Sequence, residues 1–149
     1  MWNDVLISLQ NEYEYKKRGK YDLKEYVAFN NAKRIIEYIQ KTDIVLTEHI
    51  GSPELNLKEQ GKRDVEIYNE DTAWLRESDI LIGECSCPSL GVGYELAYAE
   101  KLGKPCHIFY DRSKTQLSAM LTGNPYFTIH PYEKEEDIYP ILDQILNSK

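Results

Sequence analysis

The sequence has no long hydrophobic run, few cysteines and no excess of positive charge. No apolar stretch approaches the ~20 residues of a membrane-spanning helix, so we expect no contact with a membrane. The three cysteines, Cys85, Cys87 and Cys106, are an odd number, which argues against a disulfide framework. Cys85 and Cys87 also lie too close together for the usual spacing of zinc ligands. We therefore expect buried free thiols and no bound metal.

Acidic residues outnumber basic ones, 25 to 18, which gives a net charge of −7 and a pI of about 5.0. A nucleic-acid polymer requires a basic surface, so this composition disfavours such a partner. A single phosphate group can still be bound, because amide donors at a helix N-terminus hold it locally. Residues 1–4 do not have the charged and apolar regions of a secretory signal, so we expect a cytoplasmic protein.

Short apolar runs alternate with helical patterns along the chain, without repeats or linkers. The patterns predict strands over 5–9, 44–47, 79–83, 105–110 and 127–130, and helices over about 23–39, 63–77, 92–102, 115–121 and 135–146. Such alternation predicts a parallel sheet with helices on both faces. We therefore expect one α/β domain over residues 1–149, with a flavodoxin-like, Rossmann-like three-layer fold and a five-stranded parallel sheet.

The segment after strand 79–83 is the most informative part of the sequence, because ligands bind at the carboxyl ends of strands in such sheets. Gly91 and Gly93 would let the backbone approach a ligand closely. Ser89 can cap the following helix or contact an anion, and both roles stay open. Glu95 is expected about one turn into this helix, where the helix dipole would keep it ionised. An ionised carboxylate facing a sugar carbon can act as a nucleophile.

Asp71 is the candidate second carboxylate, in the helix that precedes strand 79–83. A retaining glycosidic mechanism uses two carboxyl groups ~5–5.5 Å apart, one as nucleophile and one as acid and base. The sequence supplies the pair but does not give their separation.

Four blocks of residues occur in a specific order along the chain. They are Thr47-Glu48-His49, then Glu70-Asp71 with Trp74, then the run Pro88-Ser89-Leu90-Gly91-Val92-Gly93-Tyr94-Glu95-Leu96, and finally Leu117-Ser118-Ala119-Met120. Together they closely resemble the 2'-deoxynucleoside 5'-phosphate N-hydrolases, relatives of the nucleoside 2-deoxyribosyltransferases. The resemblance covers about three quarters of the chain, from about Ile35 onward.

By this resemblance, Glu95 matches the nucleophile that attacks C1' of the deoxyribose and releases the base. Asp71 matches the residue that helps the base depart and then activates water. Ser89 matches a contact to the 5'-phosphate. His49 matches a position lining the substrate pocket, although a histidine that caps the end of a strand is an equal alternative. The resemblance implies no metal or organic cofactor.

The resemblance also implies a homodimer, because Ser118, Ala119 and Met120 match a segment that reaches into the neighbouring subunit's site. The first loop departs from the family pattern. The family has a glycine-rich loop with an arginine after its first strand, whereas residues 10–19 here contain one glycine and two glutamates. Ser8 could stand for the serine of that loop.

Three functions therefore remain open from the sequence. The first is an N-glycosidase that hydrolyses the base–sugar bond of (deoxy)nucleoside 5'-monophosphates through a glycosyl-enzyme intermediate. The second is a deoxyribosyltransferase, in which a second base resolves the same intermediate. The third is a nucleotide-binding module without catalysis, which the altered first loop suggests.

Overall fold

The computed structural model describes residues 4–9, 33–46 and 61–148, and for residues 4–9 it describes the backbone alone. The predictions for His49, for the side chain of Ser8 and for the loop at 10–19 lie outside the described residues.

Five parallel strands form one sheet, in the order β2-β1-β3-β4-β5. Their bounds are β1 Asp4–Leu9, β2 Ile44–Val45, β3 Ile80–Glu84, β4 Cys106–Asp111 and β5 Thr128–Tyr132. The predicted α/β architecture is therefore confirmed, and this strand order is that of flavodoxin-like sheets. β2 is shorter than predicted, because the chain turns at Leu46.

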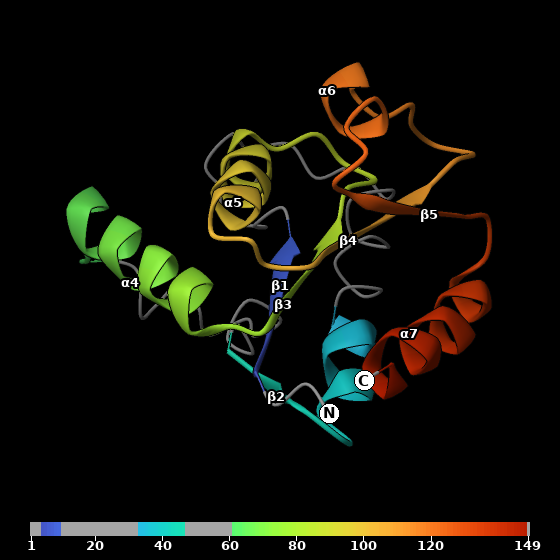
Figure 1. The fold of residues 1–149 in the computed structure, drawn as a ribbon, viewed down its shortest axis with the longest axis horizontal. Helices are drawn as coiled ribbons and strands as arrows, with labels where there is room; N and C mark the ends of the chain where they lie inside the picture. The colour runs from blue at the N-terminus through green and yellow to red at the C-terminus, as the bar shows by residue number, and fades with distance from the viewer. Residues whose placement is uncertain (1–3, 10–32, 47–60, 149) are drawn as a thin grey trace.

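Helices connect these strands (Figure 1). They comprise a helix over 33–39, α4 Asp64–Glu77, α5 Leu90–Lys101, α6 Ala119–Thr122, the 3-10 turn η2 Glu135–Asp137 and α7 Ile138–Asn147. The predicted helix over 115–121 is wrong in extent, since α6 has only four residues. Ser118 caps it through its side chain, which accepts a hydrogen bond from the amide of Met120, so the helix begins only after Ser118. None of the helices that the structure describes is long and apolar enough to span a membrane.

β3 carries apolar side chains to both faces of the sheet, and all five of its residues are buried. Ile80 and Ile82 point into the core shared with the helix over 33–39 and α7, while Leu81 points into the core shared with α4 and α5. Each such side chain contributes about 1.5–3 kcal/mol when fully buried. Two cores on opposite faces make the three layers visible in Figure 1.

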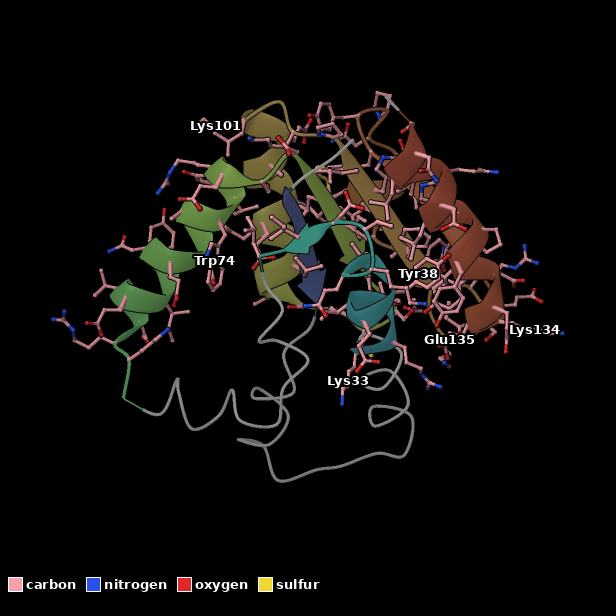
Figure 2. The ribbon with its side chains drawn as sticks, turned by 90° about the horizontal axis from the view of Figure 1, so that it is seen from below. Lys33, Tyr38, Trp74, Lys101, Lys134 and Glu135 are labelled. Carbon is pink, nitrogen blue, oxygen red and sulfur yellow. The ribbon has the colours of Figure 1, made fainter. Side chains whose placement is uncertain are left out.

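The helix over 33–39 packs beside α7, as Figure 2 shows around Tyr38 and Glu135. The ring of Tyr38 lies 4.7 Å from that of Tyr139, and its hydroxyl donates to Asp143 at 2.6 Å. Arg34 forms an ion pair with Glu135 at 3.2 Å. These contacts join the first and last described helices on one face of the sheet.

The link from α5 to β4 also contacts the C-terminal end of α4. Gly103, with φ of 72°, takes the left-handed conformation expected of a glycine just past a helix C-terminus. The next residue, Lys104, places its ammonium 2.9 Å from the carbonyl of Arg76 and 2.6 Å from that of Ser78. A cation is favourable there because free carbonyls gather at the end of α4.

Two histidines form a pair across β4 and β5 that the sequence did not suggest. Nδ1 of His107 lies 2.9 Å from Nε2 of His130, and the rings stack at 15°. Burial, with a contribution from His130, lowers the pKa of His107 to about 4, and burial also lowers the pKa of His130. A neutral pair can share one hydrogen bond, whereas two charged imidazoles would repel each other.

We therefore expect stability to fall as the pH drops from 7 to 5. The unfolded chain takes up protons near pH 6.5, while folded His107 resists protonation until about pH 4. His107 should account for about 1 kcal/mol of this loss, after allowance for solvent screening. Urea unfolding at both pH values measures it, and His107→Phe should show a smaller difference between them. An equal difference in wild type and variant would contradict the expectation.

Candidate active site

The loops that follow β3 and β4 lie at the carboxyl edge of the sheet. The loop after β3 runs from Cys85 to Ser89, and α5 then begins at Leu90. Ser89 has an extended backbone and its Oγ accepts a hydrogen bond from the amide of Val92 at 3.4 Å. Its predicted role as a helix cap is confirmed. The amides in the first turn of α5 have no partners within the helix and are a potential anion site.

A pocket of about 380 Å³ lies between α5 and the segment over 115–124. Its volume falls in the range of small-molecule sites. Its walls comprise Cys85, Cys87, Pro88 and Ser89, then Val92, Gly93, Leu96, Ala97 and Glu100, and finally Thr115, Gln116, Leu117, Ser118, Met120, Leu121, Asn124 and Phe127. The pocket thus brings together four of the predicted site residues, Ser89, Gly93, Ser118 and Met120. Gly91 and Ala119 are not among its lining residues.

The backbone around Gly91 and Gly93 is open rather than strained. Neither residue has a positive φ, and a Cβ added at Gly93 would meet no atom of the described residues within 4 Å. At Gly91 it would meet only Ser89 Oγ, at 3.7 Å. The backbone conformation at these two positions therefore does not require glycine. The absence of side chains leaves room for a ligand next to the backbone.

Glu95 lies on a different flank of α5 from the pocket, and it is half-buried. Its neighbours Tyr94 and Tyr98 contact α4, where the Tyr94 hydroxyl lies 3.3 Å from that of Tyr68 and Arg76 donates to Tyr98 at 3.2 Å. Glu95 shares a helix face with Tyr98, three residues on.

Asp71 is half-buried on α4 and shares a face with Tyr68, three residues before it. The buried neighbour Thr72 donates its hydroxyl to the carbonyl of Tyr68 at 2.7 Å. α4 and α5 contact each other through Tyr68 and Tyr94, whose ring centroids lie 6.3 Å apart. The two predicted carboxylates thus lie on neighbouring helices.

The prediction that the helix dipole keeps Glu95 ionised is wrong, because Glu95 lies farther from the start of the helix than expected. α5 begins at Leu90, two residues earlier than the predicted start at Val92, because Ser89 is its cap. Glu95 is therefore beyond the first turn, which contains no acidic residue. Since the effect of the dipole falls off within the first turn, it does not account for an ionised Glu95.

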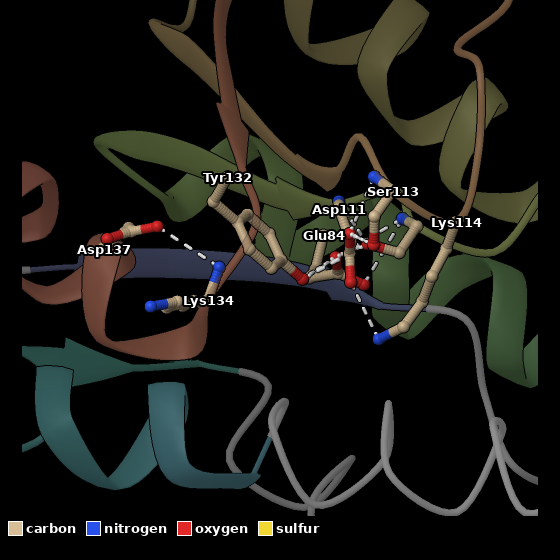
Figure 3. Close-up of polar contacts among 8 residues, drawn as sticks. Glu84, Asp111, Ser113, Lys114, Tyr132, Lys134 and Asp137 are labelled. Carbon is tan, nitrogen blue, oxygen red and sulfur yellow. Dashed lines mark hydrogen bonds and ion pairs between the residues drawn. The ribbon is translucent and has the colours of Figure 1, made fainter.

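A buried polar cluster at the ends of β3, β4 and β5 was not predicted (Figure 3). Glu84, the last residue of β3, accepts a hydrogen bond from the hydroxyl of Tyr132 at 2.8 Å and another from the hydroxyl of Ser86. Asp111, the last residue of β4, accepts hydrogen bonds from the amide and the hydroxyl of Ser113, and it forms an ion pair with Lys114 at 2.8 Å. The one signal in the sequence was an acidic residue directly after each apolar run.

The two carboxyl groups of this cluster differ in their electrostatics. Burial raises the pKa of Glu84, although the hydrogen bonds from Ser86 and Tyr132 oppose the shift. For Asp111, burial acts in the same direction but is outweighed by Lys114 and Ser113, so its pKa is lowered. Burial and the nearby Glu84 raise the pKa of Tyr132. Asp111 is therefore held ionised, while the environment of Glu84 favours its neutral form.

The buried cysteines, Cys85 and Cys106, are poor nucleophiles. Burial, with the charges of Glu84 and Glu95, raises the pKa of Cys85 to about 12, and burial with Glu100 does the same for Cys106. A thiol reacts as its thiolate, which is scarce at neutral pH under these conditions. Cys85 and Cys106 are buried and Cys87 is half-buried, and none of the three forms a disulfide among the described residues. In the described part of the chain, no three His, Cys, Asp or Glu side chains gather to hold a metal.

Comparison with known proteins matches residues 25–135 to the family described as Nucleoside 2-deoxyribosyltransferase. The 5-hydroxymethyl-dUMP N-hydrolase of Mus musculus is 41% identical over 110 residues, which cover 69% of this chain and 63% of that one. A protein of Syntrophotalea carbinolica, provisionally named 2'-deoxynucleoside 5'-phosphate N-hydrolase 1, is 38% identical over 114 residues, or 76% of this chain and 80% of its own.

Solved structures support the fold. The CMP N-glycosidase of Clostridium botulinum superimposes with a TM-score of 0.62 at 16% identity, over 96% of this chain and 99% of that one. A 2-deoxyribosyltransferase of Bacillus psychrosaccharolyticus gives 0.55 at 16% identity, over 91% and 90%. With the family match spanning most of the sequence and the same sheet architecture, the chain belongs to the nucleoside 2-deoxyribosyltransferase family.

Proposed function

We propose that this protein is an N-hydrolase that splits the base–sugar bond of 2'-deoxynucleoside 5'-monophosphates. The observation that carries the proposal is the pair of half-buried carboxylates, Asp71 and Glu95, on the neighbouring helices α4 and α5. The names of the relatives, which are N-hydrolases of nucleotides, support the same reaction. The open first turn of α5, behind Ser89, is suited to the phosphate of such a substrate.

The chemistry follows the retaining glycosidic pattern. Glu95 attacks C1' of the deoxyribose, the N-glycosidic bond breaks, and the base leaves with a proton from Asp71. A glycosyl ester of Glu95 results. Asp71, now a carboxylate, takes a proton from water as that water attacks C1'. The ester bond breaks, which frees deoxyribose 5-phosphate and restores both carboxyl groups.

We expect Glu95→Gln and Asp71→Asn to lower kcat/KM at least about 100-fold, because each removes a nucleophile or an acid and base. The assay follows free base by chromatography across ribo- and deoxyribonucleoside monophosphates, with 5-hydroxymethyl-dUMP among them, and the unphosphorylated nucleosides. Glu77→Gln, at the exposed end of α4, is the matched control and should keep wild-type activity. Full activity in Glu95→Gln would show that the nucleophile is another residue.

Deoxyribosyl transfer is the second candidate, because the family that matches residues 25–135 is named for it. Both reactions share the glycosyl ester and differ in the group that resolves it. Adding a second free base to the assay distinguishes them. A new nucleoside would establish transfer, whereas free base and sugar phosphate alone would establish hydrolysis.

We also propose a homodimer in which Ser118 of one subunit completes the site of the other. The side chain of Ser118 is exposed at the start of α6, and Met120 is 81% exposed, which leaves this segment available to a second copy. Both residues also line the pocket beside α5. The arrangement would place binding groups of two chains around one substrate.

This arrangement predicts complementation between two impaired variants. Ser118→Ala and Glu95→Gln subunits refolded together should form hybrid dimers with one intact site, so that activity recovers to about a quarter of wild type by random pairing. Initial rates at low substrate concentration measure this, against each variant refolded alone. Activity no higher than the sum of the two separate variants would place Ser118 and Glu95 in the same subunit's site or in none.

A further inference from the structure

Glu84 occupies the place in the sheet where a ligand is expected. It ends β3, which pairs with β1 on one side and β4 on the other. From β3 the chain passes to α5 on one face, whereas the helix over 33–39 covers the opposite face. Connections that diverge to opposite faces open a crevice at the carboxyl edge, and doubly wound folds bind ligands there. Glu84 nevertheless has only 9% of its surface exposed.

The carboxyl group of Glu84 is fully engaged by neighbouring donors. Oε1 accepts the hydroxyls of Tyr132, at 2.8 Å, and Ser86. The amide of Ser86 lies 3.3 Å from Oε1 and 3.4 Å from Oε2. Glu84 therefore holds both the side chain and the backbone of the second residue in the loop that leads to Ser89.

Ser86 extends this contact to a second loop. Its Oγ accepts a hydrogen bond from the amide of Asp111 at 2.8 Å. The Asp111 carboxylate in turn accepts from the amide and the hydroxyl of Ser113, at 2.9 and 2.6 Å, and pairs with Lys114. The chain from Ser113 continues to Ser118. Through Ser86, Glu84 thus connects the loop that leads to Ser89 with the end of β4, from which the chain continues to Ser118.

We propose that Glu84 is a positioning residue, which fixes the loop after β3 so that Ser89 contacts the 5'-phosphate of the substrate in the same subunit, and fixes the end of β4 so that Ser118 reaches the neighbouring subunit's site. This inference rests on the proposed function. Burying a carboxyl group is costly, and an apolar side chain at the end of a buried strand would avoid that cost. Glu84 accepts hydrogen bonds from Ser86, in the loop after β3, and from Tyr132 of β5. We infer that the buried carboxyl group is kept because it fixes this loop.

The test compares two variants with a matched control. Tyr132→Phe removes one donor to Glu84 and leaves the bonds from Ser86, and Glu84→Gln changes the carboxyl group itself. Tyr139→Phe is the control, because it removes a similar hydroxyl that donates to Glu135 and, in the described part of the chain, makes no hydrogen bond to Glu84, Ser86 or Asp111. We expect KM for a deoxynucleoside monophosphate to rise about tenfold in both variants. This is the effect of losing one hydrogen bond to a charged group, here the 5'-phosphate of the substrate. The values of kcat, and KM for the unphosphorylated nucleoside, should stay close to wild type.

A purely structural role would not raise KM for the phosphorylated substrate alone and leave kcat and KM for the nucleoside unchanged. If both variants melt at a lower temperature but keep the wild-type preference for the phosphorylated substrate, the positioning role is wrong. If Glu84→Gln does not fold, Tyr132→Phe decides by itself.

If wild type releases no base from any nucleotide, the proposed function fails independently, and hydrogen exchange then tests the positioning. Amides over 85–93 and 111–118 should exchange faster in Tyr132→Phe than in Tyr139→Phe. Equal exchange in the two variants would overturn the inference.

Discussion

The burial of β3 on both faces is the constraint on which the rest of the structure depends. All five of its residues are buried, so helices must cover the sheet on each side. Ile82 belongs to one core, and its neighbour Leu81 belongs to the other. Connections that leave the carboxyl edge must then diverge to opposite faces. The edge that they leave open is where Ser89, Glu84 and the start of α5 lie.

Helix α5 separates two kinds of surface. One flank, with Gly93 and Leu96, lines a mostly apolar pocket against the segment over 115–124. Another flank carries Tyr94 and Tyr98, which make contacts with α4. A single helix can therefore contact both the pocket and α4, because its residues at different angles face different neighbours. The cap at Ser89 sets the start of α5 and with it the direction of every side chain on the helix.

The polar cluster below this helix shows why burial alone does not describe the site. Glu84 is as buried as core residues, yet its carboxyl group is occupied by hydroxyls from the loop after β3 and from β5. Asp111 remains ionised beside Lys114, whereas burial favours the neutral form of Glu84. The two acidic residues end adjacent strands, but the pKa of one is raised and that of the other is lowered. The difference arises from the groups around each carboxyl rather than from the carboxyl itself.

The sequence by itself determined the strand and helix alternation, the parallel sheet, and the helices that carry Asp71 and Glu95. These features follow from periodic burial within short segments, which depends on neighbours in the chain. Only the tertiary structure decided that Glu84, Ser86 and Tyr132 share hydrogen bonds, since they come from separate strands and loops up to 48 residues apart. It also decided that α5 begins at Leu90, that α6 is short, and that His107 meets His130. Pairings across strands and buried polar contacts depend on which segments meet in space, and local patterns do not encode that.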